Sequence, residues 1–224
     1  IKMNNKFFQI SRENMIKNQI ITNQVSSQSL IDAISEIERE RFVPAESHSI
    51  VYSDSNILIK NKRFLMKAFI FAKMIQNCNI KNKDSILVIG CLTGYSVAII
   101  SKLCGYAFGV ENDNDMVAKA NNTLSSIGCL NCSVSYSNLQ DGYKKNAPYD
   151  KIIIEGGIEF VPKVILEQIR EGGEIFFMMK KDNGIVYEFT LGIKANNLVS
   201  YRPIFTCNSI LLDDFISNDK NKSF

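Results

Sequence analysis

The sequence is poor in histidine, the residue on which many nucleophilic and zinc sites depend: its 224 residues include only His48. A catalytic triad that needs a histidine is therefore not supported. The six cysteines include one pair with CxxC spacing, Cys129 and Cys132. Zinc would need a second pair of ligands, so we expect no metal. Redox chemistry is the alternative for this pair, and ordinary thiols in a reducing compartment are the expectation.

Long apolar runs and a strong charge imbalance are also missing. No apolar run approaches the ~20 residues that a membrane-spanning helix requires, and the first residues lack the pattern of a secretion signal. The formal net charge of +3 is too small to indicate binding to nucleic acid or to a membrane surface. We therefore expect a cytoplasmic protein with neither of those partners; the sequence leaves its oligomeric state open.

The length and composition favour one globular domain, because 46% of the residues are hydrophobic and no internal repeat or proline-rich linker interrupts the chain. We expect a single domain over 1–224. Within it, 1–80 forms a helical segment on the substrate side, 81–214 forms the core, and 215–224 is a frayed tail.

From residue 84 onward, apolar runs alternate with amphipathic segments, which is typical of strands joined by crossover helices. The expected strands are 86–90, 106–110, 132–136, 150–154 and 174–179, and the expected helices are 94–103, 114–127 and 162–169. The runs 185–193 and 204–212 suit an antiparallel pair at one edge. Before the sheet we expect a helix over 10–21, a second that is capped by Ser26 or Ser27, continues into 38–41 and stops at 42–44, and a third over 63–76. A short strand is expected at 57–59. The fold class is therefore α/β, with a mostly parallel, Rossmann-like sheet and helices on both faces.

The stretch from Ile86 to Tyr95 places a tight turn, with Gly90 and Gly94, between a buried strand and a helix. Such a turn presents backbone N–H groups to nucleotide-like ligands. About twenty residues later, a carboxylate, Glu111, ends the next strand, where it is placed to accept ribose hydroxyls. Together these features indicate a nucleoside-containing cofactor.

Several strings also resemble the protein-L-isoaspartate O-methyltransferase family, over roughly residues 11 to 212. The segment Ile37–Pro44 is similar to the family's "(V)PRExFVP", and Val51–Asp54 is similar to its "AYxD". Gly90, Gly94 and Tyr95 fall on "LEIGTGSGY". The segments 147–153 and 162–173 resemble "APFDAII" and "IPxxLLEQLxxGG". This resemblance implies a class I methyltransferase fold and S-adenosyl-L-methionine as the cofactor.

The resemblance also implies roles for particular residues. Its implied cofactor-binding residues are Gly90, Cys91, Leu92, Gly94, Glu111, Asn112, Asn138 and Leu139. On the substrate side it implies Tyr52, Ser53, Met66 and Lys67, with Asp54 as the candidate catalytic residue close to the methyl donor. The implied substrate is a protein or peptide that carries isoaspartyl residues.

The sequence departs from the family pattern at several positions, among them Asn138, which stands about where the family's "GDG" aspartate would be. Val88 stands where the family has an acid, and Leu92 replaces the middle glycine of the turn. A side chain there narrows the approach of a ligand to the backbone. Phe64 and Met66 replace hydroxyl residues of the family's "TISQP" stretch, and neither can donate a hydrogen bond to a carboxylate.

Three functions therefore stay open. The first is methylation of isoaspartyl residues by S-adenosylmethionine, a displacement that needs alignment and no special catalytic motif. The second is a divergent relative that binds the cofactor or a related ligand and methylates a different acceptor or none. The third is an interaction module without enzymatic activity. A nucleic-acid methyltransferase is disfavoured, because neither a basic patch with aromatics nor an Asn/Asp-Pro-Pro-aromatic motif is visible.

Overall fold

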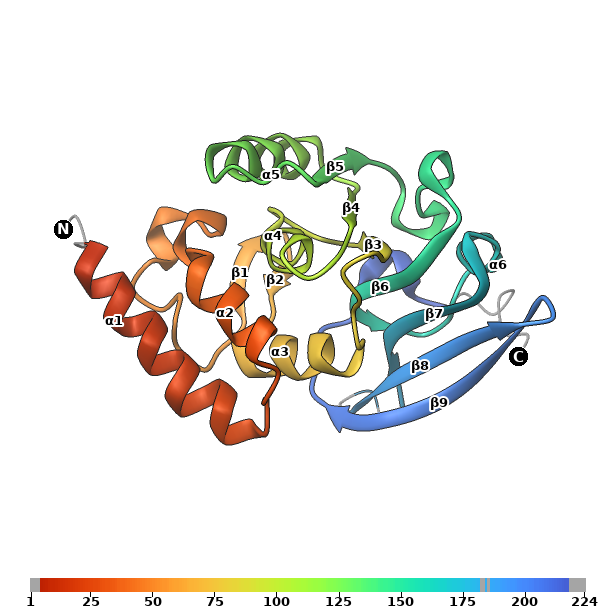
Figure 1. The fold of residues 1–224 in the computed structure, drawn as a ribbon, viewed down its shortest axis with the longest axis horizontal. Coiled ribbons are helices and arrows are strands. Elements are labelled where there is room, and N and C mark those ends of the chain that lie inside the picture. Colours follow the sequence, from red (N-terminus) through yellow and green to blue (C-terminus); the bar gives the residue numbers. More distant parts are fainter. Residues whose placement is uncertain (1–4, 182–183, 185, 218–224) are drawn as a thin grey trace.

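A computed structural model describes residues 5–181, 184 and 186–217, and its centre is a seven-stranded sheet in the order β5-β4-β3-β6-β7-β8-β9 (Figure 1). The strands are β3 (Ser85–Ile89), β4 (Tyr106–Glu111), β5 (Cys132–Tyr136), β6 (Tyr149–Ile158), β7 (Ile169–Lys180), β8 (Tyr187–Ala195) and β9 (Leu198–Cys207). The five neighbouring strands β5, β4, β3, β6 and β7 pair in parallel. Strands β8 and β9 complete one edge as antiparallel neighbours. This arrangement confirms the expected α/β fold class.

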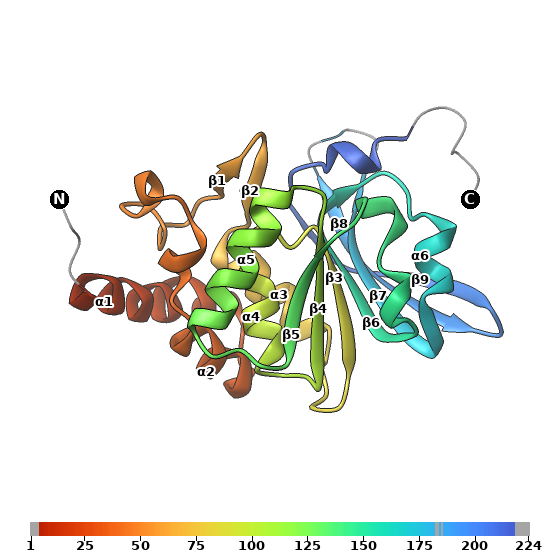
Figure 2. The same ribbon diagram turned by 90° about the horizontal axis from the view of Figure 1, so that it is seen from above.

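Helices connect the parallel strands and cover both faces of the sheet (Figures 1 and 2). The crossover helices are α4 (Tyr95–Ser101), α5 (Asn114–Ser126) and the short α6 (Lys163–Glu167). The N-terminal part supplies α1 (Asn5–Met15), which continues as a π-helical turn (Ile16–Ile20), then α2 (Gln28–Glu36) and α3 (Ala68–Asn77). Strands β3 to β5 are therefore joined in the way that the alternating sequence pattern predicts.

The hydrophobic core lies in two clusters, one on each face of the sheet. Successive side chains of a strand point to opposite faces. In β3, Ile86 and Val88 accordingly pack in the cluster that contains residues of α1 to α5, whereas Leu87 and Ile89 pack with Ile165 of α6. A strand that is buried on both faces reads as an unbroken apolar run, which is why β3 was recognisable in the sequence.

The expected helix over 63–76 is wrong at its start. Residues 63–65 form strand β2 (Arg63–Leu65), which pairs antiparallel with β1 (Ile57–Lys60). Asn61 and Lys62 join them with positive φ angles of 45° and 61°, as a two-residue hairpin turn requires. The apolar spacing of this segment fits a helix, but pairing across the turn decides its structure. The short strand expected at 57–59 is confirmed.

The C-terminal expectations also need correction. The last strand is β9 (Leu198–Cys207) and not 204–212. Residues 208–217, called the C-terminal strap below, cross the ends of the central strands instead. The frayed tail was expected to begin at 215, but Phe215 is fully buried against Phe160. Ile185 and residues 218–224 lie outside the described part of the chain.

Smaller differences concern the ends of helices. Helix α2 ends at Glu36 and does not continue through 38–41, because Ile37 and Glu38 are extended and Arg39–Phe42 forms a separate 3-10 turn. Helix α6 ends at Glu167, two residues before the expected end, and β7 begins at Ile169. Ser27 occupies the position before α2, but its side chain makes no capping hydrogen bond. Instead, the backbone N–H groups of Ser26 and Ser27 donate to the Gln76 side chain at 2.7 and 2.9 Å.

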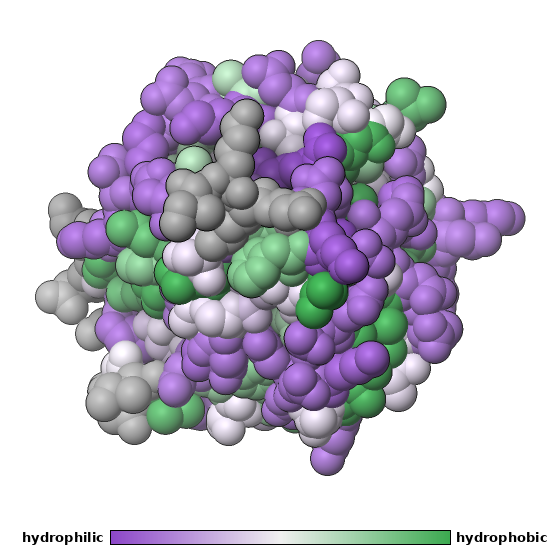
Figure 3. Space-filling view, turned by 90° about the vertical axis from the view of Figure 1, so that its left-hand side faces the viewer, coloured by the Kyte–Doolittle hydropathy of each residue, from purple (hydrophilic) through white to green (hydrophobic). Residues whose placement is uncertain are grey.

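The face that is turned to the left of Figure 1 is mainly hydrophilic, with small separated hydrophobic areas on the part drawn in colour (Figure 3). Scattered apolar residues of this kind are normal on a protein surface and do not by themselves indicate a docking site. Among the described residues, no helix is both long and apolar enough to cross a bilayer.

Candidate active site at the carboxyl ends of the strands

The strand order reverses between β3 and β6, which pair directly through Ile89 and Ile154. In open α/β sheets, ligands bind outside the carboxyl ends of the strands at such a switch point. Gly90 follows β3 here, Glu155 lies in β6 just after Ile154, and Glu111 ends the neighbouring β4. The β1–β2 hairpin and the C-terminal strap lie at the same end of the sheet (Figure 2).

Glu111, the residue expected to bind ribose, is fully buried and bonded to the protein. The Arg63 guanidinium donates to both of its oxygens, from Nη1 to Oε1 at 2.7 Å and from Nη2 to Oε2 at 2.9 Å. The backbone N–H of Asn112 donates to Oε1 at 3.0 Å, and that of Leu92 donates to Oε2 at 2.9 Å. An ionised carboxylate has about four acceptor positions. All of them are therefore taken, two by Arg63.

Arg63 also contacts the glycine turn, because its Nη2 lies 3.2 Å from the Gly90 carbonyl oxygen. A Cβ built on Gly90 would lie only 3.3 Å from the same nitrogen, and the φ of Gly90 is +79°. The position therefore suits glycine for two reasons: its backbone is left-handed, and a guanidinium lies close to it. A ligand that approaches this turn meets Arg63 first.

Leu92 occupies the centre of the turn with a φ of +53° and is 2% exposed. A left-handed conformation costs a non-glycine residue roughly 1–2 kcal/mol. The turn nevertheless keeps the shape of a glycine turn. The backbone N–H of Leu92 donates to the Glu111 carboxylate. Leu92 lies in the cavity lining, and its effect on the approach of a ligand stays a prediction.

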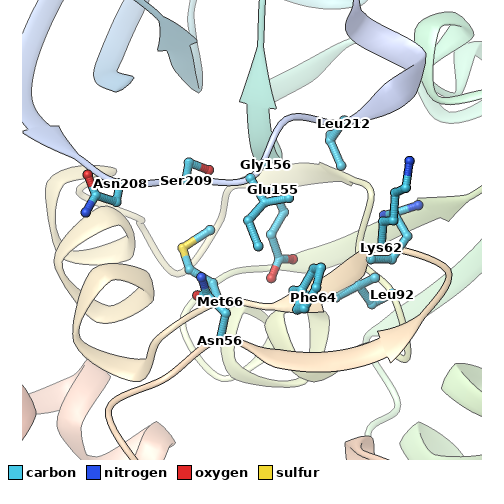
Figure 4. Close-up of a pocket in the computed structure, with 12 residues that line it drawn as sticks. Asn56, Lys62, Phe64, Met66, Leu92, Glu155, Gly156, Asn208, Ser209 and Leu212 are labelled. Carbon is cyan, nitrogen blue, oxygen red and sulfur yellow. The ribbon is translucent and has the colours of Figure 1, made fainter. Parts of the chain in front are cut away.

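Glu155 is a second buried acid at the switch point, 7% exposed. Its Oε2 atom has no hydrogen-bond partner among the described residues, although Ser96 lies close enough to favour the ionised carboxylate. Loss of hydration raises the pKa of Glu155 to about 7, and the charge of Glu111 adds to this rise, while Ser96 and Arg63 oppose it. Figure 4 shows its carboxylate between Met66 and Phe64.

The C-terminal strap closes the cavity from the side of β6. The N–H of Gly157 donates to Ile210 at 2.8 Å, and the N–H of Leu212 donates back to Gly157 at 2.9 Å. Leu212 packs so tightly on Gly156 that an added Cβ there would lie 2.5 Å from its Cγ. Further along, Asp214 accepts a hydrogen bond from the Asn112 amide at 2.9 Å.

The space that these groups enclose is small, about 30 Å³. It is lined by Asn56, Lys62, Arg63, Phe64, Met66, Leu92, Glu155, Gly156, Asn208, Ser209, Ile210 and Leu212 (Figure 4). Pockets for ligands of drug size measure roughly 300–1,000 Å³. The cofactor-binding role of Glu111 and the glycine turn stays a prediction, and the space that Arg63 and Leu212 line is too small for a nucleoside cofactor in this arrangement.

The structure brings only some of the predicted substrate-side residues to this cavity. Met66 lines it, and the Lys67 backbone donates to the cavity residue Asn56 at 3.0 Å. Tyr52 donates its hydroxyl hydrogen bond to Glu40 and lies outside the lining. Loss of hydration, followed by the nearby Glu40 carboxylate, raises the Tyr52 pKa.

Ser53 and Asp54 also lie outside the lining. The Ser53 hydroxyl donates to the Ile50 carbonyl at 2.6 Å, and the half-exposed Asp54 carboxylate lies 3.8 Å from the Lys67 ammonium. No residue of α1 or α2 lines the cavity. The role of Asp54 in catalysis stays a prediction.

The other predicted cofactor residues lie in the glycine turn or in the segment after β5. Cys91 is buried, and loss of hydration, followed by the charge of Glu111, raises its pKa. Gly94 (φ +91°) precedes α4, where an added Cβ would lie 3.1 Å from Ala120. Leu139 is fully buried, and the amide of the neighbouring Asn138 donates to Asp141 at 3.0 Å.

A larger cavity of about 600 Å³ lies elsewhere, between residues 41–46, β1 and α5. Its charged groups are of both signs, with Arg41, Lys60 and Lys119 facing Glu46 and Asp115. Thr93 is its one residue from the glycine turn. The volume alone does not make it the active site, since the buried acids at the strand ends lie outside its lining.

Sequence reasoning missed Arg63, Glu155 and the strap. Arg63 was assigned to the first turn of a helix, so its approach to Glu111 was not foreseen. Glu155 carried a usable signal, because it directly follows the apolar run of a parallel strand and therefore lies at the ligand-binding edge. Leu212 had no such signal, because its packing depends on where the strap crosses the sheet.

Comparison with known proteins identifies a family. The sequence profile described as Protein-L-isoaspartate(D-aspartate) O-methyltransferase (PCMT) matches residues 10–202. A protein-L-isoaspartate O-methyltransferase of Geobacter metallireducens is 30% identical over 168 residues, 75% of this chain and 78% of its own length. One from Helicobacter pylori is 27% identical over 197 residues, 85% and 93% of the two lengths.

Solved structures show the same fold. A protein-L-isoaspartate O-methyltransferase superposes with a TM-score of 0.79 at 21% identity, covering 90% of this chain and 65% of its own. A Plasmodium falciparum structure described as a putative enzyme of this kind, in complex with S-adenosyl-L-homocysteine, gives 0.76 at 14% identity, covering 92% and 98%. The sequence match ends before the strap.

Proposed function

Because this chain belongs to the protein-L-isoaspartate(D-aspartate) O-methyltransferase family, we propose that it transfers a methyl group from S-adenosylmethionine to the carboxylate of isoaspartyl residues in proteins. The observation that carries the proposal is Glu111, a fully buried acid that ends β4 beside the Gly90 turn. An acid at this position of the fold suits the hydroxyls of a ribose.

The proposed reaction does not require a general acid or a general base. When bound, S-adenosylmethionine supplies an activated methyl group, and the acceptor carboxylate is already ionised at neutral pH. The chain contributes alignment and exclusion of water. The side chains that suit the exclusion of water are Phe64, Met66 and Leu92, because they line the cavity with apolar surface.

Arg63 determines when the site can bind its cofactor. Ribose hydroxyls can bond Glu111 only after the guanidinium has left at least one of its oxygens, since the remaining acceptor positions belong to backbone N–H groups. We therefore infer an open state in which Arg63 has left Glu111 and Leu212 has left the Gly90 turn. The apparent affinity is then lowered by the fraction of molecules that are closed.

A second function is favoured by one observation, the position of Glu155. Its carboxylate lies in the cavity beside Phe64 and Met66, neither of which can donate a hydrogen bond to an acceptor carboxylate. When ionised, Glu155 repels a second carboxylate and suits an acceptor that carries a hydrogen-bond donor, such as a hydroxyl or an amine. The alternative is thus a relative that binds the cofactor and methylates a different group, or none.

Calorimetric titration with S-adenosylhomocysteine tests the cofactor site. We expect binding by the wild type and tighter binding by Arg63→Ala, because the substitution removes the group that competes for Glu111. Arg170→Ala, which breaks an exposed ion pair with Asp150, is the matched control and should bind like the wild type. Absence of binding to both the wild type and Arg63→Ala would contradict both methyltransferase readings.

Incubation with a labelled methyl donor tests the acceptor. An isoaspartyl peptide and the same peptide with ordinary aspartate are compared. Incorporation into the isoaspartyl peptide alone supports the first function, whereas cofactor binding without incorporation transfers support to the second.

We further propose that residues 1–80 and 81–214 work as one methyltransferase domain in a reducing compartment such as the cytoplasm. Asn56 and Met66 from the first segment line the same cavity as Leu92 and Glu155 from the second. All six cysteines are free thiols, which supports a reducing compartment.

A further inference from the structure

Cys129 and Cys132 lie at the opposite end of the sheet from the cavity. Cys129 follows α5 in a tight turn, in which Gly128 has a φ of +73° and the Cys129 N–H donates to the Leu124 carbonyl at 3.0 Å. Cys132 is the first residue of β5, so the pair belongs to the amino end of a parallel strand. Neither sulfur contributes to the candidate active site.

The turn brings the two sulfurs together. The Ser101 hydroxyl lies 3.7 Å from the Cys129 sulfur, and the Cys132 thiol is near enough to that sulfur to shift the pKa values of both cysteines. Asn131, between the two cysteines, donates from its amide to the Ser101 carbonyl at 2.8 Å. This anchor holds the turn against the end of α4 and keeps the pair in place.

The pair is also accessible, unlike most of the other cysteines. Both Cys129 and Cys132 are partly exposed, and Leu130 beside them is 92% exposed. Cys78, Cys91 and Cys104 are buried in the core. A small disulfide reagent can therefore reach the turn without unfolding the protein.

The surroundings favour a thiolate at Cys129. The Cys132 hydrogen bond lowers the Cys129 pKa most, and the Ser101 hydroxyl and the Lys102 ammonium lower it further. Partial burial and the Glu36 carboxylate act in the opposite direction, and Glu36 is itself paired with Lys102. The interaction with the Cys129 sulfur, with burial and the nearby Cys104, raises the Cys132 pKa. The two thiols therefore have different roles, as attacking and resolving groups.

We propose that Cys129 and Cys132 are a redox-active dithiol that forms an intramolecular disulfide by exchange with glutathione disulfide or another small disulfide. The Cys129 thiolate attacks one sulfur of the reagent, and one glutathione thiolate leaves as a mixed disulfide forms. Cys132 then loses its proton and attacks the Cys129 sulfur, which expels the second glutathione thiolate. Two protein thiols are oxidised and one glutathione disulfide is reduced to two glutathione molecules.

A metal site is the competing use of two adjacent thiols. Among the described residues, no group of three or more potential histidine, cysteine or carboxylate ligands is close enough to hold a metal ion. Structural zinc almost always takes four protein ligands. Two thiols on a turn that is otherwise lined by Ser101 and Asn131 therefore suit exchange chemistry better.

The test equilibrates the full chain in glutathione buffers of graded redox ratio, blocks free thiols with an alkylating reagent and maps the cysteines by mass spectrometry. In the wild type we expect an unblocked, disulfide-linked pair at Cys129 and Cys132 in the more oxidising buffers, reversed by dithiothreitol. Cys132→Ser should accumulate glutathione on Cys129, because the resolving thiol is gone. Cys129→Ser should leave Cys132 largely free.

Cys207→Ser is the matched control, because Cys207 is also partly exposed but its sulfur contacts Met178 at 3.6 Å and not another cysteine. This variant should form the Cys129–Cys132 disulfide unchanged. In the wild type at neutral pH, Cys129 should be alkylated more than about tenfold faster than Cys207, since burial raises the Cys207 pKa to about 11. Equal alkylation rates, or a pair that stays reduced in every buffer, would overturn the proposal.

Discussion

At the scale of single residues, Glu155 has an unfavourable position that should be visible in the pH dependence of stability. Its carboxyl pKa is about 7 in the folded chain and 4.5 in an unfolded one. Between these values the unfolded state binds fewer protons, so the free energy of unfolding falls as pH rises, by up to ~3 kcal/mol above pH 7.

Glu155→Gln should remove that contribution. We expect the variant to be more stable than the wild type at pH 8 and similar to it at pH 4, as measured by urea unfolding across this range. Glu171→Gln, on the surface, is the control and should leave the profile unchanged. A profile that is the same in Glu155→Gln and the wild type would show that Glu155 ionises normally.

Arg63 has opposite effects on stability and on ligand binding. It stabilises the closed chain, and it competes with the cofactor for Glu111. Removal of one partner of a buried ion pair typically costs 3–5 kcal/mol, since the other charge is left buried and unpaired. We expect Arg63→Ala to lower the free energy of unfolding by about 3 kcal/mol in denaturant titrations, because Glu111 is fully buried. Arg170→Ala should cost less than ~1 kcal/mol, because its ion pair is exposed. Equal losses in the two variants would contradict a structural role for the Arg63–Glu111 pair.

At the scale of elements, the parallel strands and the antiparallel pair at one edge could be predicted, whereas the β1–β2 hairpin and the bounds of β9 could not. The apolar runs of β3 and β6 fix the parallel core because both faces of these strands are buried. The β1–β2 and β8–β9 connections both depend on two-residue turns with positive φ, at Asn61 and Lys62 and at Asn196 and Asn197. Asparagine tolerates that conformation, so Asn196-Asn197 was a missed signal, whereas Asn61-Lys62 carries a weak one. The position of Arg63 in the site follows from the first of these turns.

The C-terminal strap is the element most suited to opening, because a few hydrogen bonds and two apolar anchors hold it. Leu212→Ala removes one anchor, and a buried leucine truncated to alanine typically costs 2–5 kcal/mol. We expect faster hydrogen exchange at the amides of Gly157 and Leu212, which bond across the strap, and unchanged exchange in β8. Exchange that is unchanged at these two amides would mean that the strap opens only with the whole fold.

At the scale of the whole molecule, closure of the cleft predicts how ligand binding should proceed in time. Two separate parts of the chain close the same cleft, Arg63 from the β1–β2 hairpin and Leu212 from the strap, and both lie against the Gly90 turn. S-adenosylhomocysteine can occupy the site only in molecules where both have moved, so the opening step limits the observed rate once the ligand is in excess.

In stopped-flow measurements, the observed binding rate of the wild type should therefore reach a plateau as the concentration of S-adenosylhomocysteine rises. Arg63→Ala should raise the plateau or replace it with a linear dependence, because one of the two closing groups is gone, and Leu212→Ala should act in the same direction. Arg170→Ala should behave as the wild type does. A linear dependence in the wild type itself would show that the open state is already the populated one, and that the Arg63–Glu111 pair does not control access to the cofactor site.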